Sequence, residues 1–332
     1  MKQRSQNIIL LIVSTVCSLL FLEGILRGLY PYYKNYNSEM WRYGKDIKKI
    51  SGDARVSHEH QANKKGEYYG VTIATNSNGW RDREYTERPE KYRLMILGDS
   101  ITLGWGVKNE DSYPRILERL LKSKGRDVEV LNTGVGNYNT QNEVYAYLKK
   151  GQQFHPHEIV VGYYINDTEV IKPTQNPVQY FLMTTYLFSL AADKWLTFRA
   201  KVFENFQYTN FYSSLYQSSF RGRHATEEAF SVLSQHCQKE KIRLSVAIIP
   251  EMHQFKNYPF PEVAQFVQSV GAKQQFPVAD LLPNFLNETP SSLWVSMEDA
   301  HPNAAGQAII ASGIYDSLLK DQDGVRRSLA GG

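Results

Sequence analysis

Apolar residues form short runs of strand length along most of the chain, and amphipathic segments separate these runs. Five runs predict β-strands, at residues 94–97, 128–131, 159–165, 244–249 and 277–281. Apolar positions three and four residues apart predict helices that include residues 116–121, 142–150, 225–239, 262–270 and 304–319. Strands that alternate with helices indicate an α/β domain with a parallel sheet, and continuous apolar strands suit burial on both faces of that sheet.

The N-terminal segment has a different pattern. Ile8–Leu22 carries no charge, and Lys2 and Arg4 precede it. With the apolar residues that follow Glu23, this segment reaches the ~20 residues that cross a bilayer. No small-x-small cleavage site follows, which favours an uncleaved anchor over a signal peptide, and the basic start favours a cytoplasmic N-terminus. We therefore expect a single-pass protein of a bacterial inner membrane, with the rest of the chain on the periplasmic, extracytoplasmic side.

The remaining stretches complete the predicted domain organisation. Residues 1–33 form the cytoplasmic tip and transmembrane segment, and the polar residues 34–90 form a lead-in that packs against the main domain. Residues 91–322 form that domain, and 323–332 form a tail. Within the domain, residues 170–223 are rich in Tyr, Phe and Leu and predict an inserted, mostly helical cap. This cap is either a lid that contacts an acyl chain or an ordinary packed insertion.

Composition excludes several classes of protein. The 332 residues are 42% hydrophobic and 22% charged, which is typical of globular proteins. The net charge of +4 and the lack of a dense basic stripe argue against a nucleic-acid partner. Cys17 lies in the apolar N-terminal segment, so Cys237 is the only thiol in the rest of the chain and no internal disulfide is expected there. Such cysteine usage fits the cytosol or a bacterial periplasm.

Polar residues and glycines follow three of the predicted strands. Ser100 comes after the first strand, the turn Gly134–Asn137 after the second, and Asn166 after the third. The carboxyl ends of parallel strands meet at one edge of a sheet, where ligands bind in open α/β folds. A serine at this edge becomes a nucleophile only when a neighbouring base removes its proton.

His301 is the best candidate for that base. Asp299 lies two residues before it and directly ahead of a predicted helix, and Glu298 is a reserve candidate. A carboxylate on the far nitrogen of an imidazole fixes its tautomer and stabilises the imidazolium. The alternative is that Asp299 only starts the helix and His301 is merely exposed.

A tetrahedral intermediate also needs donors for its oxyanion, each of which contributes about 2.7–4 kcal/mol in other enzymes. The side-chain amide of Asn166, the backbone N–H groups of Gly136 and Asn137, and the N–H of Ser100 are the candidates. The sequence does not decide whether Gly136 or Asn137 provides the backbone N–H for the oxyanion. Each of these residues also has an alternative explanation as an ordinary turn residue.

Two histidine pairs have metal-like spacing, His58 with His60 and His155 with His157. Neither has a nearby cysteine or a third ligand, so we expect surface loops rather than metal sites. No Walker-type loop and no Gly-x-Ser-x-Gly elbow is present. We therefore expect neither a metal nor a cofactor.

Four blocks together resemble the SGNH (GDSL) hydrolase family over about residues 75–320. These blocks are Ile96–Gly106, Leu131–Tyr138, Tyr164–Asp167 and Asp299–Gly306. The resemblance implies a flavodoxin-like three-layer α/β/α sandwich with a parallel sheet, carrying an N-terminal transmembrane helix and the helical insertion in addition.

The resemblance also implies a mechanism without metal or cofactor. Ser100 would attack an ester carbonyl, His301 would carry the proton and Asp299 would orient His301. Ser100, the second block and Asn166 would hold the oxyanion.

The sequence departs from the family pattern at three positions. Gly136 lies one residue before the expected glycine, whose place Asn137 takes, although asparagine tolerates the left-handed backbone. Tyr164 stands where the third block usually has glycine. The carboxylate of Asp299 lies two residues before the histidine, where many members use three. This spacing is similar to the one found in membrane-associated relatives that O-acetylate exopolysaccharides. The resemblance therefore does not decide whether the protein hydrolyses an ester or transfers its acyl group.

The predicted function is a serine esterase that acts on an extracytoplasmic acyl ester, with an O-acetylated polysaccharide as one candidate substrate. The first alternative is an O-acyltransferase that modifies an exopolysaccharide with the same residues. The second alternative is an inactive, anchored glycan-binding protein.

Overall fold

The computed structural model describes residues 2–30, 36–88, 90–171, 185–202 and 208–320. The chain divides into two compact units. One unit contains Met1–Lys45 and Thr174–Phe206, and the other contains Asp46–Pro173 and Gln207–Gly332. The predicted tail at 323–332 lies outside the described residues.

The larger unit is built on a five-stranded parallel sheet with the strand order β6-β5-β7-β8-β9. The strands are β5 (Tyr92–Gly98), β6 (Val128–Asn132), β7 (Glu158–Tyr163), β8 (Arg243–Ile248) and β9 (Val278–Asp280). All five coincide with predicted strands to within a few residues. The α/β class with a parallel sheet is therefore confirmed.

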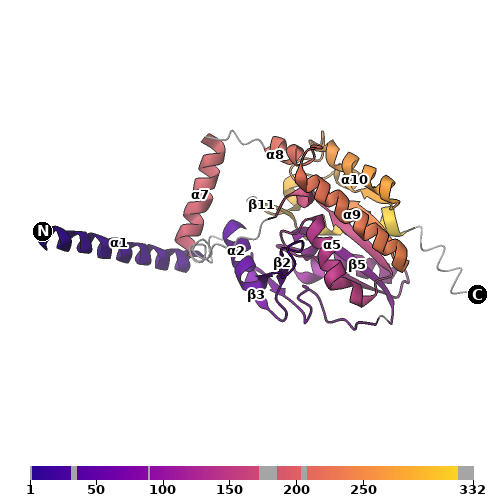
Figure 1. Cartoon of the computed structure of the whole chain (residues 1–332), viewed down its shortest axis with the longest axis horizontal. Helices are drawn as coiled ribbons and strands as arrows, with labels where there is room; N and C mark the ends of the chain where they lie inside the picture. The colour runs from indigo at the N-terminus through magenta and orange to yellow at the C-terminus, as the bar shows by residue number, and fades with distance from the viewer. Residues whose placement is uncertain (1, 31–35, 89, 172–184, 203–207, 321–332) are drawn as a thin grey trace, which may run out of the picture. The chain divides into compact units, whose positions relative to one another are not determined.

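Helices cover both faces of this sheet, which gives three layers (Figure 1). One face packs against α5 (Thr140–Lys149), α9 (Arg221–Glu240) and α10 (Pro261–Gln274). The other packs against α4 (Tyr113–Ser123), α11 (Ala304–Ile314) and the π-helix Tyr315–Leu319.

The two apolar cores follow from the alternation of side chains along each strand. In β5, Met95 and Leu97 belong to the core under α5, α9 and α10. Leu94 and Ile96 belong to the core under α4 and α11. Continuous apolar strands were predicted for this reason, because a sheet with two covered faces has no solvent side.

The lead-in contains two small hairpins that the sequence did not predict correctly. One hairpin consists of strands β3 (Lys65–Tyr68) and β4 (Val71–Ala74) with a turn between them. Tyr69 and Gly70 have φ angles of 51° and 81°, as a tight hairpin turn requires. The other hairpin pairs β1 (Lys48–Ile50) with β2 (His58–His60).

A buried arginine joins the lead-in to the main domain. The guanidinium of Arg81 donates hydrogen bonds to the carbonyl oxygens of Gly104 (2.6 Å), Val107 (2.8 Å) and Thr72 (2.8 Å). A buried arginine is stabilised when its N–H groups have acceptors, and here backbone carbonyls accept from both terminal nitrogens. The lead-in from residue 46 onward is thus part of the same folded body as the sheet.

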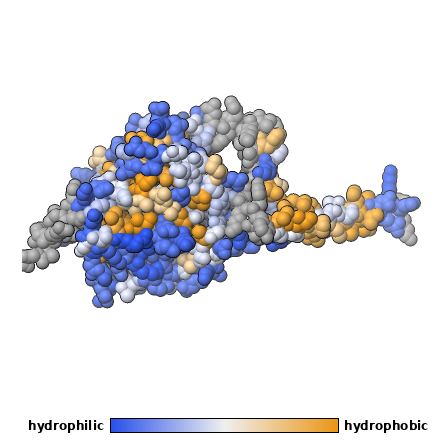
Figure 2. Space-filling model, turned by 180° about the vertical axis from the view of Figure 1, so that it is seen from behind, coloured by the Kyte–Doolittle hydropathy of each residue, from blue (hydrophilic) through white to orange (hydrophobic). Residues whose placement is uncertain are grey.

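The smaller unit contains α1 (Lys2–Leu29), most of α2 (Tyr36–Ile47) and α7 (Tyr186–Val202). In α1, the segment Gln3–Leu29 is long and apolar enough to cross a membrane, and its apolar side chains are exposed (Figure 2). Glu23 accepts hydrogen bonds from the N–H groups of Tyr186 and Leu187, so it caps the first turn of α7.

The described part of the predicted insertion at 170–223 is largely helical and contains α7 and α8 (Tyr208–Leu215). Residues 172–184 and 203–207 of that insertion lie outside the described residues. The short elements that remain are α3 (Ser100–Leu103), the 3-10 helices η2 (Asn109–Asp111), η3 (Gly151–Phe154), η4 (Ile165–Thr168), η5 (Leu282–Phe285) and η6 (Pro290–Leu293), and strands β10 (Trp294–Ser296) and β11 (Asp299–Pro302).

Candidate active site

Ser100 is the first residue of α3, directly after strand β5. Asp99 caps this helix, because its Oδ1 accepts the N–H of Ile101 at 2.8 Å. A Cβ on Gly98 would lie 1.9 Å from Oγ1 of Thr102, so the sharp turn from strand to helix requires glycine there. The turn holds the serine hydroxyl at the carboxyl edge of the sheet, and Ser100 is only 6% exposed.

His301 and Asp299 lie on a short strand directly ahead of the predicted helix, and this strand was not expected from the sequence. They belong to β11, which pairs antiparallel with β10 through an irregular register. The helix α11 begins only after Asn303, whose Oδ1 accepts the N–H groups of Ala305 and Gly306. The hairpin fixes the backbone on both sides of the imidazole.

The structure brings the three candidate catalytic residues together. Oγ of Ser100 lies 2.8 Å from Nε2 of His301, and Nδ1 of His301 lies 2.5 Å from Oδ1 of Asp299. The same oxygen accepts the backbone N–H of His301 at 3.0 Å. The reserve candidate, Glu298, is exposed to solvent. This geometry allows the imidazole to remove the hydroxyl proton while the carboxylate fixes the tautomer.

Trp105 completes the support of Asp299, and the sequence analysis did not single it out. Its Nε1–H donates to Oδ2 of Asp299 at 2.9 Å, and the indole is buried. Both carboxylate oxygens therefore have donors. The only sequence signal was its place in the first family block, five residues after the serine.

Charge pairing shifts the pKa values of this pair. Burial alone would lower the pKa of His301, but the adjacent Asp299 carboxylate outweighs burial and raises it above the usual 6.5. Burial would raise the pKa of Asp299, but the charge and hydrogen bonds of His301 hold it below the usual 3.8. Asp299 is therefore ionised at neutral pH.

The second-block turn lies against the nucleophile helix. A Cβ on Gly134 would approach the backbone nitrogen of Leu103 to 2.3 Å, so this close contact requires glycine. The N–H groups of Gly134 and Val135 already donate, to Oδ1 of Asn132 (3.0 Å) and the carbonyl of Gly98 (3.2 Å).

Asn137 has the left-handed backbone that its place in the motif requires, with φ of 63°. Its backbone N–H donates to no other group among the described residues. Of the two donors that the sequence left open in this turn, Asn137 is thus a suitable one for an oxyanion.

Asn166 lies in η4, immediately after β7, and is close to the nucleophile. Its side chain hydrogen-bonds the Asp99 carboxyl, which tends to lower the pKa of that group, although burial prevails and raises it. Oδ2 of Asp99 is 3.4 Å from Oγ of Ser100. The structure therefore brings Asn166 to the same edge of the sheet as Ser100.

The expectation that His58 and His60 lie in a surface loop is wrong. Both belong to strand β2, and His60 is buried with Nδ1 2.8 Å from the carbonyl oxygen of Gly79. Burial lowers the pKa of both imidazoles to about 3, so both are neutral. Among the described residues, no cluster of three or more His, Cys, Asp or Glu side chains could hold a metal ion.

A second carboxylate–imidazole pair follows β8. Glu251 accepts the backbone N–H of His253 at 3.0 Å and also contacts its Nδ1, as Asp299 does with His301. Glu251 is buried, whereas His253 is half-exposed and contacts the ring of Trp294. The signal for this pair was present in the sequence as Glu-x-His after a strand, but the sequence analysis overlooked it.

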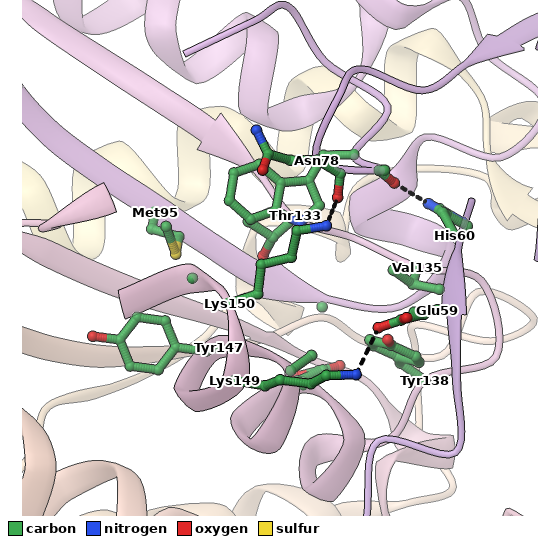
Figure 3. Close-up of a pocket in the computed structure, with 16 residues that line it drawn as sticks. Glu59, His60, Asn78, Met95, Thr133, Val135, Tyr138, Tyr147, Lys149 and Lys150 are labelled. Carbon is green, nitrogen blue, oxygen red and sulfur yellow. Dashed lines mark hydrogen bonds and ion pairs between the residues drawn. The ribbon is translucent and has the colours of Figure 1, made fainter. Parts of the chain in front are cut away.

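A cavity of about 40 Å³ lies between the lead-in and α5 (Figure 3). Glu59, His60 and Asn78 line it from the lead-in, and Tyr147 and Lys150 line it from the main domain. The residues that carry the candidate chemistry do not line this cavity. It marks the junction of the two segments rather than the catalytic centre.

Residues 96–309 match the family described as the GDSL-like Lipase/Acylhydrolase family. No curated protein matches the chain significantly.

Several solved structures have a similar fold. They include a lipase/acylhydrolase from Enterococcus faecalis, with 16% identity, a TM-score of 0.44, and coverage of 70% of this chain and 96% of that one. The psychrotrophic esterase EstA from a Pseudoalteromonas species has 13% identity, a TM-score of 0.43, and coverage of 70% and 98%. A variant of the acetyl-xylooligosaccharide esterase Axe2 from Geobacillus Stearmophilus has 14% identity, a TM-score of 0.45, and coverage of 68% and 93%. At these identities the likeness concerns the fold alone.

Proposed function

Since the chain belongs to the GDSL-like lipase/acylhydrolase family, we propose that it hydrolyses acyl esters with Ser100 as nucleophile, His301 as general base and Asp299 as the carboxylate that orients the base. The class of enzyme, an ester-bond hydrolase, follows from the family. The observation that carries the residue assignment is the pair of short contacts from Oγ of Ser100 to Nε2 of His301 (2.8 Å) and from Nδ1 of His301 to Asp299 (2.5 Å).

The reaction proceeds in two halves. Oγ of Ser100 bonds to the ester carbonyl carbon as Nε2 of His301 takes its proton, and the carbonyl oxygen becomes an oxyanion. The backbone N–H of Asn137 and the side chain of Asn166 donate to that oxygen. Collapse of the intermediate breaks the ester C–O bond, and the alcohol leaves with the proton from His301. Water then attacks the acyl-serine, again with His301 as base, and releases the acid.

Asp299 and Trp105 act on His301 and not on the ester. The carboxylate stabilises the imidazolium that forms in both halves of the reaction. The indole N–H holds the second carboxylate oxygen at 2.9 Å and so limits rotation of Asp299. Each transfer of the proton thus starts from one fixed ring orientation.

We further propose that the substrate is an ester outside the cytoplasm and that α1 anchors the enzyme in a bacterial inner membrane. The N-terminal apolar helix supports this, because Gln3–Leu29 is long and apolar enough to cross a membrane and its apolar side chains are exposed. An O-acetylated glycan of the cell envelope fits such a location. Transfer of the acyl group to a glycan hydroxyl uses the same steps, with that hydroxyl in place of water.

The test is turnover of p-nitrophenyl acetate by the full chain in detergent. We expect Ser100→Ala to reduce kcat/KM by at least about 10³-fold, as removal of a serine nucleophile does elsewhere. Ser213→Ala is the matched control, because the hydroxyl of Ser213 donates to Glu262 of α10 and not to one of the three candidate catalytic residues. Equal activity in wild type and Ser100→Ala, or fluorophosphonate labelling that survives Ser100→Ala, would refute the assignment. Acetate release with and without an added glycan acceptor separates hydrolysis from transfer.

A further inference from the structure

The hairpin of β1 and β2 reaches the second-block turn from outside the region that matches the family. The Nζ of Lys48 donates to the carbonyl oxygen of Gly136 and to Oδ1 of Asn137, the latter at 2.8 Å. Nε2 of His58 lies 3.0 Å from the same Gly136 carbonyl oxygen. Two side chains of the lead-in therefore converge on one peptide group.

That peptide group is the one whose N–H we assign to the oxyanion. The carbonyl of Gly136 and the N–H of Asn137 belong to the same planar amide, so they point in opposite directions. Donors on the oxygen fix the plane of the amide and, by polarising it, make the N–H a stronger donor. They also hold Asn137 at φ of 63°, a conformation that is uncommon for a residue other than glycine.

We infer that Lys48 and His58 are positioning residues for catalysis, which act through the Gly136–Asn137 amide to aim its N–H at the oxyanion. The inference rests on the proposed function, because it takes the N–H of Asn137 as an oxyanion donor. It assigns the lead-in a part in the reaction, although the family match begins only at residue 96.

The two side chains have little freedom to move away. The imidazole of His58 packs edge-on against Tyr138, whose hydroxyl donates to the His58 carbonyl at 2.6 Å. Oγ of Ser57 lies 3.3 Å from Nδ1 of His58, and a donated hydroxyl proton there leaves the ring proton on Nε2, facing Gly136. Lys48 starts the strand that pairs with β2, opposite His60.

Further contacts attach the hairpin to the helix that follows the turn. Lys149 of α5 lies 3.1 Å from Glu59 of β2, and Lys150 donates to the carbonyl of Asn78 (Figure 3). Lys149 also donates to Oγ of Ser51 at 3.0 Å. The hairpin, the turn and the C-terminal end of α5 thus form one connected body, which suits a positioning role.

The charges around the amide are consistent with this role. Burial lowers the pKa of Lys48 to about 7. Its amine donates to the Gly136 carbonyl oxygen and to Oδ1 of Asn137, and a protonated amine polarises the Gly136–Asn137 amide more strongly than a neutral donor would.

The experiment compares Lys48→Met with Lys49→Met in the full chain. Lys49 is the next residue of β1, is exposed and pairs with Glu59 at 3.2 Å, so it controls for loss of charge on the same strand. We expect Lys48→Met to lower kcat for p-nitrophenyl acetate about tenfold with KM within about twofold, because a weakened oxyanion donor affects the transition state more than the bound substrate. We expect the rate constant of fluorophosphonate labelling to fall in parallel, and Lys48→Arg, which keeps a donor, to recover most of the loss.

His58 provides an independent test if Lys48→Met does not fold. His58→Gln keeps an N–H donor and His58→Leu removes it, so we expect only the leucine variant to lose kcat. Unchanged kcat in folded Lys48→Met and His58→Leu, a loss confined to KM, or an equal loss in Lys49→Met would overturn the inference. These outcomes are distinct from failure of the proposed function, which would appear as full activity in Ser100→Ala.

Discussion

At the scale of single residues, the pH dependence follows from the pairing of His301 with Asp299. The base must be neutral to accept the Ser100 proton, and Asp299 raises the pKa of His301 above 6.5 against the effect of burial. Activity should therefore be present above that pKa and should be lost as pH falls through it. In Asp299→Asn the larger of the two raising charges is absent, and only the smaller contribution of Asp99 still opposes burial. The acidic limb of the pH–rate profile should therefore move to lower pH, with kcat reduced by about 10³–10⁴-fold.

The measurement for this prediction is kcat/KM for p-nitrophenyl acetate from about pH 5 to pH 9, the range over which a histidine base titrates. Glu298→Gln, which removes the exposed neighbouring carboxylate, is the control and should leave the limb in place. An acidic limb at the same pH in wild type and Asp299→Asn would show that Asp299 does not set the pKa of the base.

The residues that lie in family blocks could be proposed from the sequence, because each follows a recognisable strand or precedes a helix. Ser100, Asn166 and His301 are of this kind. The role of Lys48 could not be proposed from the sequence. Its contact with Gly136 joins residues 88 positions apart and depends on how a three-residue strand packs against the second-block turn. His253 could have been found, since Glu251-x-His253 has the spacing of Asp299-x-His301.

At the scale of elements, the parallel strands were predictable because burial on both faces leaves a continuous apolar run. The hairpin of β10 and β11 was not, since Trp294–Ser296 and Asp299–Pro302 are short and have no such run. Pairing of two strands of this length is decided by what surrounds them rather than by local pattern. The hairpins of the lead-in could not be predicted either, because their strands are equally short.

Packing of α3 against the second-block turn gives a prediction at this scale. A Cβ on Gly134 would lie 2.3 Å from N of Leu103 and 2.7 Å from C of Thr102, both backbone atoms that cannot rotate away. Gly134→Ala must therefore displace α3, which carries Ser100. We expect a loss of about 1–3 kcal/mol in the free energy of unfolding and a marked loss of kcat.

Urea unfolding of the full chain in detergent measures the effect, with Gly52→Ala as the matched control. Nothing lies within 4 Å of a Cβ on Gly52, which is exposed, so this change should remain within about 0.5 kcal/mol of wild type. If Gly134→Ala were as stable and as active as Gly52→Ala, the close approach of the second-block turn to α3 would be needed neither for stability nor for activity.

At the scale of the whole molecule, the proposed membrane location depends on α1. Gln3–Leu29 contains 27 residues, which at 1.5 Å per residue span ~40 Å, more than the ~30 Å hydrocarbon thickness of a bilayer. Exposed side chains such as Leu10 (69%) and Phe21 (72%) would be unfavourable in water. Charges lie only near its ends, where Glu23 pairs with Arg27 at 2.8 Å and caps α7.

The full chain should consequently stay in the membrane fraction after alkaline carbonate extraction, with an intact mass that includes residues 1–33. The capping of α7 by Glu23 supports retention, because cleavage after the apolar segment would remove both a charge and a helix cap from the folded protein. A control with Leu10, Leu11 and Leu20 changed to Gln should lose membrane association, since three polar residues oppose insertion of the helix. A soluble, shortened wild-type product would identify the segment as a cleaved signal peptide and would contradict the anchor.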